Sequence, residues 1–404
     1  MKINIIDAGC GIGKTTSLIN KMNEDTTEQK YIFVTPFLSE VDRIQKSCPN
    51  KHFIAPTSLN KSGFKIDHLA QLIKRGENIV TTHALFKKIN DEKIDIEKLK
   101  DYILIMDEVA SVVEELTISK SDLSIIKEKI TINPKTHMIK WADINYQGKL
   151  DEYKNLIKMN NIFAYTNEKN EIVSLLWLFP FKIFKMFKEV YISTYMFDGQ
   201  IQKKYFDYFN VTYVYWYIKD FHITKDIQIY DYTKTKQLIR VCDNNALNEI
   251  GEKDNSLSLS WFSRNKKNEK IAQLRKNIYN FFRTHTKANS NELLWTTFKE
   301  YSGMLKRNGY SKSFAPINAR ATNEYSNKRA IAYVGNRFFK PTIKNFFTFN
   351  NIKMNKEFEK KFALSELIQF IYRGAIRNGE PIDVYIPSKR MRDLFLEWLK
   401  KPND

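Results

Sequence analysis

Cysteine is scarce in this chain: three thiols, at positions 10, 48 and 242, stand among 404 residues. Such isolated thiols provide neither a disulfide framework nor the paired spacing of a zinc site, so we expect a reducing, cytoplasmic environment. Long apolar runs are missing too. The most apolar stretch, Leu175 to Phe181, is far too short to cross a bilayer, and we expect neither a membrane span nor a signal peptide before the first strand.

Acidic residues are in the minority, with 46 Asp and Glu against 65 Lys and Arg, which gives a formal net charge of +19. This excess favours a polyanionic partner, because neutralised phosphates release their counterions. From charge alone, a basic surface without such a partner is the alternative. The hydrophobic content of 43% is that of an ordinary folded protein, and the length predicts two or three domains.

The first sixteen residues carry the most informative pattern. The apolar residues Ile3, Ile5 and Ile6 predict a buried parallel strand, and SLINKMNE at 17–24 predicts a helix. Between them lies the phosphate-binding loop pattern, with Ala8 in place of the first glycine. Its glycines let backbone N–H groups surround a polyphosphate, its lysine reaches the β- and γ-phosphates, and the next hydroxyl holds Mg²⁺. The predicted nucleotide ligands are Gly9, Gly11, Gly13, Lys14, Thr15 and Thr16.

Strands and helices alternate along residues 1–120, which predicts a parallel α/β sheet with ligands at the carboxyl ends of its strands. Residues 120–190 are polar and predict a loop-rich insertion. The predicted strands of this first lobe are 31–36, 78–83, 102–109 and 189–200.

A second α/β series follows a mixed region that is hard to assign. Its lobe is predicted to span 216–404, after a first lobe of 1–215, with a connection near 200–230. A basic segment at 264–276 predicts a helix with a solvated face. The predicted strands are 291–298, 329–335 and 382–388, and the predicted helices are 299–310 and 363–379, the last ending at Gly379.

Two carboxylates, Asp107 and Glu108, follow the apolar strand at 102–106. An Asp in this position can hold Mg²⁺, and a neighbouring Glu can orient or activate an attacking water. The alternative is a pair of acidic residues that caps the next helix. The phosphate loop upstream favours the catalytic interpretation.

Six short segments follow one another along the chain in a recognisable order: VTPFLSEVDRI at 34–44, TTHALF at 81–86, DEVA at 107–110, ISTYM at 192–196, NARATNEY at 318–325 and QFIYRGAIR at 369–377. This ordered set resembles the motifs of superfamily 2 helicases of the DEAD/DEAH-like group, and especially those of the compact helicases of phages and mobile elements. The resemblance implies two RecA-like parallel-sheet lobes of the P-loop NTPase class, with an insertion in the first lobe.

The resemblance also implies a role for each matched residue. By this resemblance, Gln369, Arg373 and Arg377 would close on the phosphates from the second lobe. Their spacing of four residues predicts one broad helix face, so joint action is geometrically possible. A surface basic stripe is the alternative for the two arginines, and their unusual spacing leaves open which one acts as the finger. The implied sets are catalytic Lys14, Glu108, Arg373 and Arg377; nucleotide-binding Asp107 and Gln369; Mg²⁺-holding Thr15 and Asp107; coupling Ser193 and Thr194; and nucleic-acid-binding Thr35, Thr81, Thr82 and Arg320.

Several positions leave alternatives open. Ala110 argues against the strict DEAD-box RNA helicases, and only six residues precede the loop, so no upstream adenine-reading motif is expected and the base selectivity stays open. His83 could touch a ligand or be a packed histidine at a strand end. Trp295 and Phe298 could stack on bases, although aromatic residues on a strand more often belong to the core.

The sequence thus predicts an ATP-dependent, Mg²⁺-requiring helicase or translocase that acts on single-stranded or forked DNA, with RNA as the other polymer. It would serve phage or mobile-element replication or recombination in the cytoplasm of a bacterial host, as a monomer or weak oligomer, with replication proteins as candidate partners. The alternatives are a packaging-type motor, which would lack the helix of Gln369 and the arginines, and a nucleic-acid-binding scaffold with a weak or vestigial ATPase.

Overall fold

The computed structural model describes residues 2–59, 62–143, 145–167, 169–318, 323–401 and 403. The chain divides into two compact units, and each has a sheet built mainly of parallel strands. The predicted α/β fold class with two parallel-sheet lobes is therefore confirmed. Unit 1 comprises Met1–Ile6, Thr15–Trp216 and Phe339–Asn355, and unit 2 comprises Asp7–Lys14, Tyr217–Phe338 and Lys356–Asp404.

The larger sheet has the strand order β12-β11-β1-β10-β4-β2-β3. Strand β4 is parallel to both of its neighbours, β10 and β2, and all of its residues are buried. A strand covered on both faces forms a continuous apolar run, which is why the sequence predicts it so clearly. The strands are β1 (Lys2–Asp7), β2 (Lys30–Thr35), β3 (Ile79–Thr82), β4 (Tyr102–Asp107), β10 (Glu189–Thr194), β11 (Tyr213–Lys219) and β12 (His222–Thr224).

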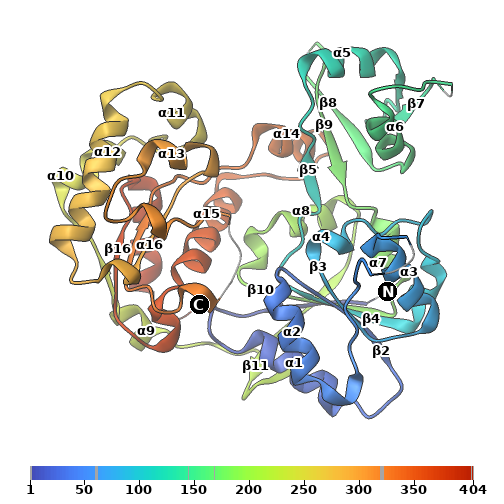
Figure 1. Cartoon of the computed structure of the whole chain (residues 1–404), viewed down its shortest axis with the longest axis horizontal. Helices are drawn as coiled ribbons and strands as arrows, with labels where there is room; N and C mark the ends of the chain where they lie inside the picture. The colour runs from blue at the N-terminus through green and yellow to red at the C-terminus, as the bar shows by residue number, and fades with distance from the viewer. Residues whose placement is uncertain are drawn as a thin grey trace. The chain divides into compact units, whose positions relative to one another are not determined.

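Helices join the strands of this sheet, as the alternating pattern predicts (Figure 1). Helix α2 packs on β2 and β3 and buries Val41 and Ile44, which are three residues apart and so share one helix face. The helices are α1 (Lys14–Glu24), α2 (Leu38–Ser47), α3 (Lys65–Arg75), α4 (His83–Phe86) and α8 (Ile201–Tyr208).

The prediction of a loop-rich stretch at 120–190 was wrong. The region forms an antiparallel sheet in the order β5-β9-β8 and a β6–β7 hairpin, together with three helices. Its strands are short, and an antiparallel sheet does not need long apolar runs. Figure 1 shows the elements from α5 to β9 standing apart from the main sheet of unit 1. The elements are β5 (Val113–Glu115), α5 (Lys120–Glu128), β6 (Ile130–Ile132), β7 (Ile139–Trp141), α6 (Asp151–Lys158), β8 (Ile162–Thr166), β9 (Ile172–Leu178) and α7 (Phe181–Met186).

A segment distant in sequence completes unit 1. The ring of Phe346, in α14 (Pro341–Phe349), has its centroid 5.6 Å from that of Phe163 and 5.4 Å from that of Tyr208. The second lobe was predicted to include all of 216–404, whereas Phe339–Asn355 belongs to unit 1. These aromatic contacts are the physical reason for the difference.

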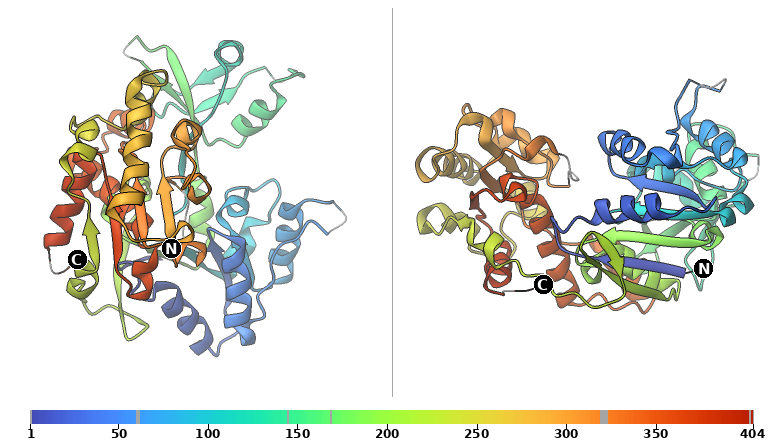
Figure 2. Two further views of the ribbon diagram at one scale, coloured as in Figure 1. Left: turned by 60° about the vertical axis from the view of Figure 1, so that its left-hand side comes forward. Right: turned by 90° about the horizontal axis from the view of Figure 1, so that it is seen from below.

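The smaller sheet, in unit 2, has the order β13-β16-β15-β14 with every pair parallel (Figure 2, left). Its core is aromatic: Trp295, Tyr333 and Tyr385 are fully buried, and the Tyr385 hydroxyl donates a 2.6 Å hydrogen bond to the carbonyl oxygen of Leu247. The elements are α9 (Thr233–Gln237), β13 (Ile239–Val241), α10 (Asn245–Asn248), α11 (Leu259–Arg264), α12 (Glu269–Asn280), β14 (Leu293–Thr296), α13 (Ser302–Leu305), β15 (Ala330–Tyr333), α15 (Lys356–Ile371), β16 (Ile382–Tyr385) and α16 (Lys389–Lys400). Across the described ranges, no helix has the length and apolar character needed to span a membrane.

Candidate nucleotide-binding site

The phosphate-loop sequence leads from β1 into α1. Gly11 and Gly13 have φ angles of +85° and +87°, which only glycine adopts without strain. The lysine that follows, Lys14, donates hydrogen bonds of 2.9 Å from Nζ to the carbonyl oxygens of Ala8 and Gly9. The loop therefore has the tight curvature that a phosphate cradle requires. The Lys14 ammonium group is hydrogen-bonded to the carbonyl oxygens of the same loop.

A hydroxyl and a carboxylate that are far apart in sequence meet in unit 1. Thr15 Oγ1, in the first turn of α1, donates a 2.9 Å hydrogen bond to Oδ2 of Asp107 at the end of β4. Asp107 is only 8% exposed. The structure thus brings together the two residues that the sequence predicts as Mg²⁺ ligands.

This donor pair suits Mg²⁺ and not a metal enclosed by protein. Mg²⁺ prefers hard oxygen ligands and is commonly held by one or two carboxylates plus substrate phosphates. The described part of the chain contains no group of three His, Cys, Asp or Glu side chains that could hold a metal ion. The pair Thr15 and Asp107 would hold the ion on its protein side.

Glu108 occupies an unusual backbone conformation, with a φ of +71°. A left-handed conformation is unfavourable for a residue with a Cβ, so it persists only where its surroundings fix it. Here the Glu108 N–H donates a 2.8 Å hydrogen bond to the carbonyl oxygen of Ser193, which lies opposite Asp107 in the β4–β10 register. The predicted catalytic carboxylate is thereby joined to the predicted coupling strand.

Two further residues hold this turn. Gln202, in α8, accepts a 3.0 Å hydrogen bond from the Ala110 N–H, a role that no sequence pattern predicts. His83 Nε2 lies 2.9 Å from the carbonyl oxygen of Asp107, and the side chain is 8% exposed. Of the two interpretations of this histidine, the packed residue at a strand end is the one the structure supports.

The predicted nucleic-acid threonines lie at the carboxyl ends of β2 and β3, where Thr35 is the register partner of Thr82. Thr35 and Thr81 are 0% and 2% exposed, whereas Thr82 is partly accessible. Of the three threonines, Thr82 is therefore the one that a ligand can reach from the surface. Arg320 lies outside the described residues, and the predicted role of the whole set stays a prediction.

The helix predicted at 363–379 ends earlier than expected. Helix α15 stops at Ile371, and a 3-10 turn at Ala375–Asn378 follows. A Cβ on Gly374 would lie 2.8 Å from the carbonyl oxygen of Lys328, whose oxygen also accepts a hydrogen bond from the Ala375 N–H. This close backbone approach ends the helix, because the Ala375 N–H is hydrogen-bonded to the neighbouring segment and not to the preceding turn of α15.

That break separates the residues of the predicted arginine face. Gln369 lies in α15, Arg373 in the turn after it, and Arg377 in the 3-10 turn. The prediction that one helix carries all three on a common face was wrong. Arg373 is 7% exposed with its guanidinium carbon 5.0 Å from the centre of the Phe370 ring, whereas Arg377 is exposed.

The two aromatic residues considered for base stacking belong to the core of unit 2. Trp295 is fully buried and donates a 3.0 Å hydrogen bond from Nε1 to the carbonyl oxygen of Tyr310. Phe298 is 6% exposed. The core interpretation of both residues is confirmed.

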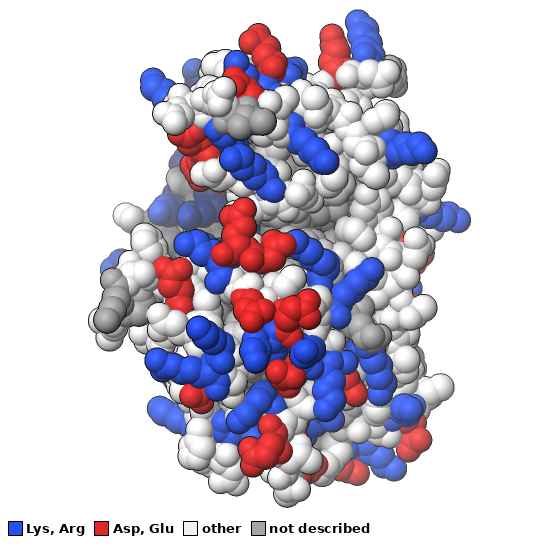
Figure 3. Space-filling model, turned by 90° about the vertical axis from the view of Figure 1, so that its right-hand side faces the viewer, with Lys and Arg blue, Asp and Glu red and all other residues white. Residues whose placement is uncertain are grey.

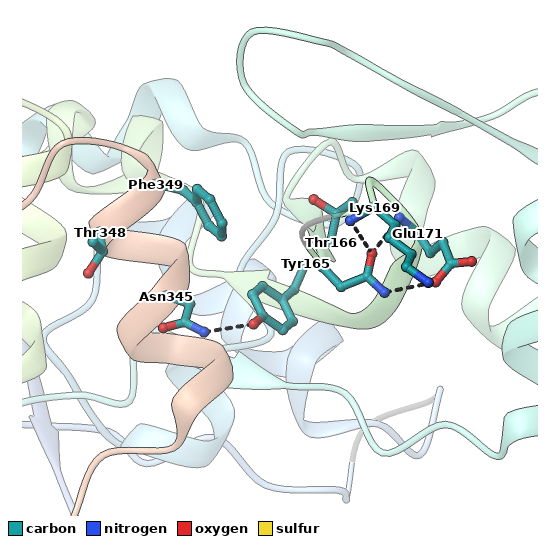
Figure 4. A pocket seen from close by; sticks show the side chains of 8 residues that line it. Tyr165, Thr166, Lys169, Glu171, Asn345, Thr348 and Phe349 are labelled. Carbon is teal, nitrogen blue, oxygen red and sulfur yellow. Dashed lines mark hydrogen bonds between the residues drawn. The ribbon is translucent and has the colours of Figure 1, made fainter.

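A pocket of about 620 Å³ lies in unit 1 between the β8–β9 turn and α14 (Figure 4). One side is bridged by Asn345 Nδ2, which donates a 2.7 Å hydrogen bond to the Tyr165 hydroxyl, while the Phe349 side chain comes from the same helix as Asn345. None of the predicted site residues lines it. The pocket therefore includes no residue of the predicted nucleotide site.

Surface charge on one face is mixed. On the face drawn in Figure 3, Lys and Arg side chains are interspersed with Asp and Glu and do not gather in one patch. The basic side chains on this face therefore do not outline a single groove.

Comparison with known proteins supplies the relatives of this chain. A family model described as the YonV C-terminal Rossmann-like domain matches residues 233–399. The SPbeta prophage-derived uncharacterized protein YonV of Bacillus subtilis (strain 168) is 39% identical over 416 residues, which cover 99% of each chain.

Solved structures show the same architecture. XPD_Helicase and XPD_APO each match with a TM-score of 0.53 over 98% of this chain and over 94% and 95% of their own, at 12% and 14% sequence identity. Likeness at this identity establishes the fold alone, which is a two-lobed α/β fold similar to that of these two XPD structures. By its full-length sequence similarity, the chain belongs to the YonV family.

Proposed function

We propose that this protein is an ATP-dependent, Mg²⁺-requiring DNA helicase or translocase. The observation that carries the proposal is the 2.9 Å hydrogen bond between Thr15 and Asp107, residues 92 positions apart. It joins the helix after a phosphate loop to the carboxylate end of β4, which is the arrangement that nucleotide hydrolysis requires. The XPD-like fold supports the same proposal.

Each residue of the loop and strand end has a task in this scheme. The backbone N–H groups around Gly11 and Gly13 would bind phosphate oxygens, and Lys14 would exchange its carbonyl partners for the β- and γ-phosphates. Thr15 and Asp107 would hold Mg²⁺, which when bound neutralises charge on the phosphates. Glu108 would orient or activate the attacking water.

Coupling to movement would use the link between β4 and β10. Because the Glu108 N–H donates a hydrogen bond to the Ser193 carbonyl oxygen, a shift of the catalytic turn would move the end of β10, which carries Ser193 and Thr194. From unit 2, Gln369, Arg373 and Arg377 would act on the phosphates. An arginine in that position stabilises charge that develops on the transferred phosphoryl group.

DNA is the proposed polymer, single-stranded or forked, with RNA as the other candidate. The net charge of +19 favours phosphate contacts, which position a protein on nucleic acid without reading its sequence. The prophage-derived relative supports a place in phage or mobile-element replication or recombination, in the cytoplasm of a bacterial host and alongside replication proteins. A monomer or weak oligomer suffices for this scheme.

The test is ATP hydrolysis by the full chain with and without single-stranded DNA, at increasing salt. We expect DNA to stimulate hydrolysis and rising salt to weaken DNA binding. Lys14→Ala should abolish hydrolysis while the fold survives, and Lys46→Ala, which removes the same charge from the exposed surface of α2, should not. Turnover in the Lys14 variant at the wild-type rate would exclude this site, and no hydrolysis by the wild type under either condition would favour the scaffold alternative.

A second measurement separates unwinding from translocation alone. Forked, 3′-tailed and 5′-tailed duplexes are offered with ATP, and strand separation is followed. Unwinding of one tailed substrate would establish a helicase and its polarity. Stimulated hydrolysis without strand separation would establish a translocase.

A further inference from the structure

The turn between β11 and β12 holds an aromatic residue in an unfavourable conformation. Lys219 pairs with His222, so Asp220 and Phe221 form a two-residue hairpin turn, and their φ angles are +48° and +60°. Two positive φ values are typical of type I′ turns, which favour Asn-Gly. A bulky side chain is disfavoured there, and Phe221 is also 54% exposed. Neither the turn nor the core explains why a phenylalanine occupies this position.

The Phe221 ring lies against the phosphate loop, within the same compact unit. A Cβ built on Gly13 would fall 2.5 Å from Cδ1 and 2.6 Å from Cε1 of that ring. Gly13 immediately precedes Lys14, so the ring covers the loop beside the residue that would reach the phosphates. Only a glycine leaves room for the ring at this point.

A second aromatic residue supports the other end of the loop. A Cβ on Gly9 would lie 1.6 Å from the hydroxyl oxygen of Tyr232, which is 4% exposed. The segment between the two rings is anchored by Tyr230, whose hydroxyl accepts a 2.8 Å hydrogen bond from the Ile218 N–H and lies 3.1 Å from its carbonyl oxygen. The segment from 220 to 232 thus contacts the phosphate loop at two glycines, with one buried ring and one exposed ring.

We propose that Phe221 stacks on the base of the nucleoside triphosphate whose phosphates the loop binds, an inference that rests on the nucleotide site proposed above. None of the predicted nucleotide ligands is aromatic, whereas an exposed ring offers a π face to any base. An uncharged ring offers nothing to phosphate oxygens, which are bound by N–H groups and cations. The strained turn is retained because it presents the ring beside the loop.

Calorimetric titration of the full chain with ATP and with tripolyphosphate, both with Mg²⁺, tests this role. Phe221→Ala should weaken ATP binding on the order of tenfold, the usual effect of removing one base-stacking aromatic side chain, and leave tripolyphosphate binding unchanged. Phe221→Trp should retain ATP binding, and its added fluorescence relative to the wild type should change when ATP binds. Phe349→Ala, which removes another exposed ring at 61% exposure, is the matched control and should bind ATP like the wild type.

The possible failures are distinct. If Phe221→Ala weakens ATP and tripolyphosphate equally, or neither, while thermal unfolding shows an intact fold, the base-stacking role is excluded and the nucleotide site stands. If the wild type binds neither ligand, the nucleotide site itself is excluded. ATP binding lost selectively in Phe221→Ala and kept in Phe221→Trp supports the proposal.

Discussion

Replacing Thr15 with valine tests the feature on which the nucleotide site depends. Valine keeps the volume and the branch at Cβ but has a methyl group in place of the hydroxyl. The change removes the 2.9 Å hydrogen bond to Asp107, a carboxylate that is 8% exposed and so has little access to replacement by water. Thr15→Ser keeps the hydroxyl and is the matched control.

The expected magnitude follows from the charge and burial of the acceptor. A hydrogen bond to a charged group contributes about 1.5–3 kcal/mol, roughly twice a neutral one. Since ~1.4 kcal/mol is a factor of ten in an equilibrium constant, losing a metal ligand of this strength should raise the half-saturating Mg²⁺ concentration by about tenfold to a hundredfold. If the hydrogen bond were purely structural, its loss would lower the free energy of unfolding by a similar amount and leave the Mg²⁺ dependence of hydrolysis unchanged.

The assay is steady-state ATP hydrolysis at fixed ATP over a range of Mg²⁺ concentrations, with urea unfolding of each variant measured in parallel. Thr15→Val should need far more Mg²⁺, and Thr15→Ser should follow the wild type. If all three proteins show the same half-saturating Mg²⁺ concentration, Thr15 is not a metal ligand and the reasoning from the Thr15–Asp107 pair is refuted.

Two other predictions concern stability and reactivity. Burial alone would raise the pKa of Asp25, but hydrogen bonds from Thr27 and Tyr31 outweigh it and lower the pKa from 3.8 to about 2. This lowering of the pKa corresponds to about 2 kcal/mol of folding stability. The stabilisation is present above the pKa of the unfolded state and is lost as the pH falls through the pKa of the folded state. Asp25→Asn should therefore lower the free energy of unfolding by about 2 kcal/mol at neutral pH. Alkylation of the partly accessible Cys10 in the phosphate loop by N-ethylmaleimide should stop ATP hydrolysis, and bound ATP should protect this thiol from the reagent. Cys48 should not react, because burial raises the pKa of its thiol to about 11.

Clear outcomes would contradict these two predictions. For Asp25, urea unfolding of both proteins is followed from neutral pH downward, and the difference should shrink between about pH 4 and pH 2 as the wild-type carboxylate is protonated. A difference that stays constant over that range would show that the ionised form has no special role. For the thiols, a Cys10→Ser variant that is inactivated as fast as the wild type would place the sensitive group elsewhere.

The strand ends of unit 1 were predictable because their physics is local. The strand ending at Asp107 is buried throughout, so its apolar run stops where a polar residue is needed at the sheet edge. The same holds for the loop after β1 and for Thr35 at the end of β2, and parallel strands bring their carboxyl ends to one edge. The pairing of Thr15 with Asp107 then follows from the topology of the sheet.

The insertion and the strands β11 and β13 could not be predicted in the same way. Strand β11 is only partly buried along most of its length, and β13 has three residues, so neither forms the apolar run typical of a central strand. In the insertion, Val173 is 48% exposed although it lies on β9, the central strand of the antiparallel sheet. Short strands with one accessible face depend on partners far away in sequence, and a single sequence does not show those partners.

The residues that contact the phosphate loop from outside were hidden for a related reason. Phe221 and Tyr232 approach Gly13 and Gly9 from about two hundred positions along the chain. The two aromatic rings require glycine at positions 9 and 13, but the phosphate-loop pattern already explains why glycine stands there. Gln202 is likewise recognised only from its hydrogen bond to the Ala110 N–H, because a glutamine in a helix has no distinguishing pattern.

The break at Gly374 changes how the two arginines must be tested. Arg373 is buried against Phe370, so its removal leaves a defect in the core and is expected to destabilise unit 2 whatever its role in catalysis. Arg377 is exposed in the 3-10 turn, where removal of a surface side chain has little effect on folding. Lost turnover in an Arg377→Ala protein therefore reports on the chemistry directly, whereas the same loss in an Arg373 variant does so only if its free energy of unfolding is unchanged. If Arg373→Lys, which keeps the charge and most of the apolar stem but not the planar fork, restores stability without restoring turnover, the buried arginine acts on the phosphates and not only on the fold.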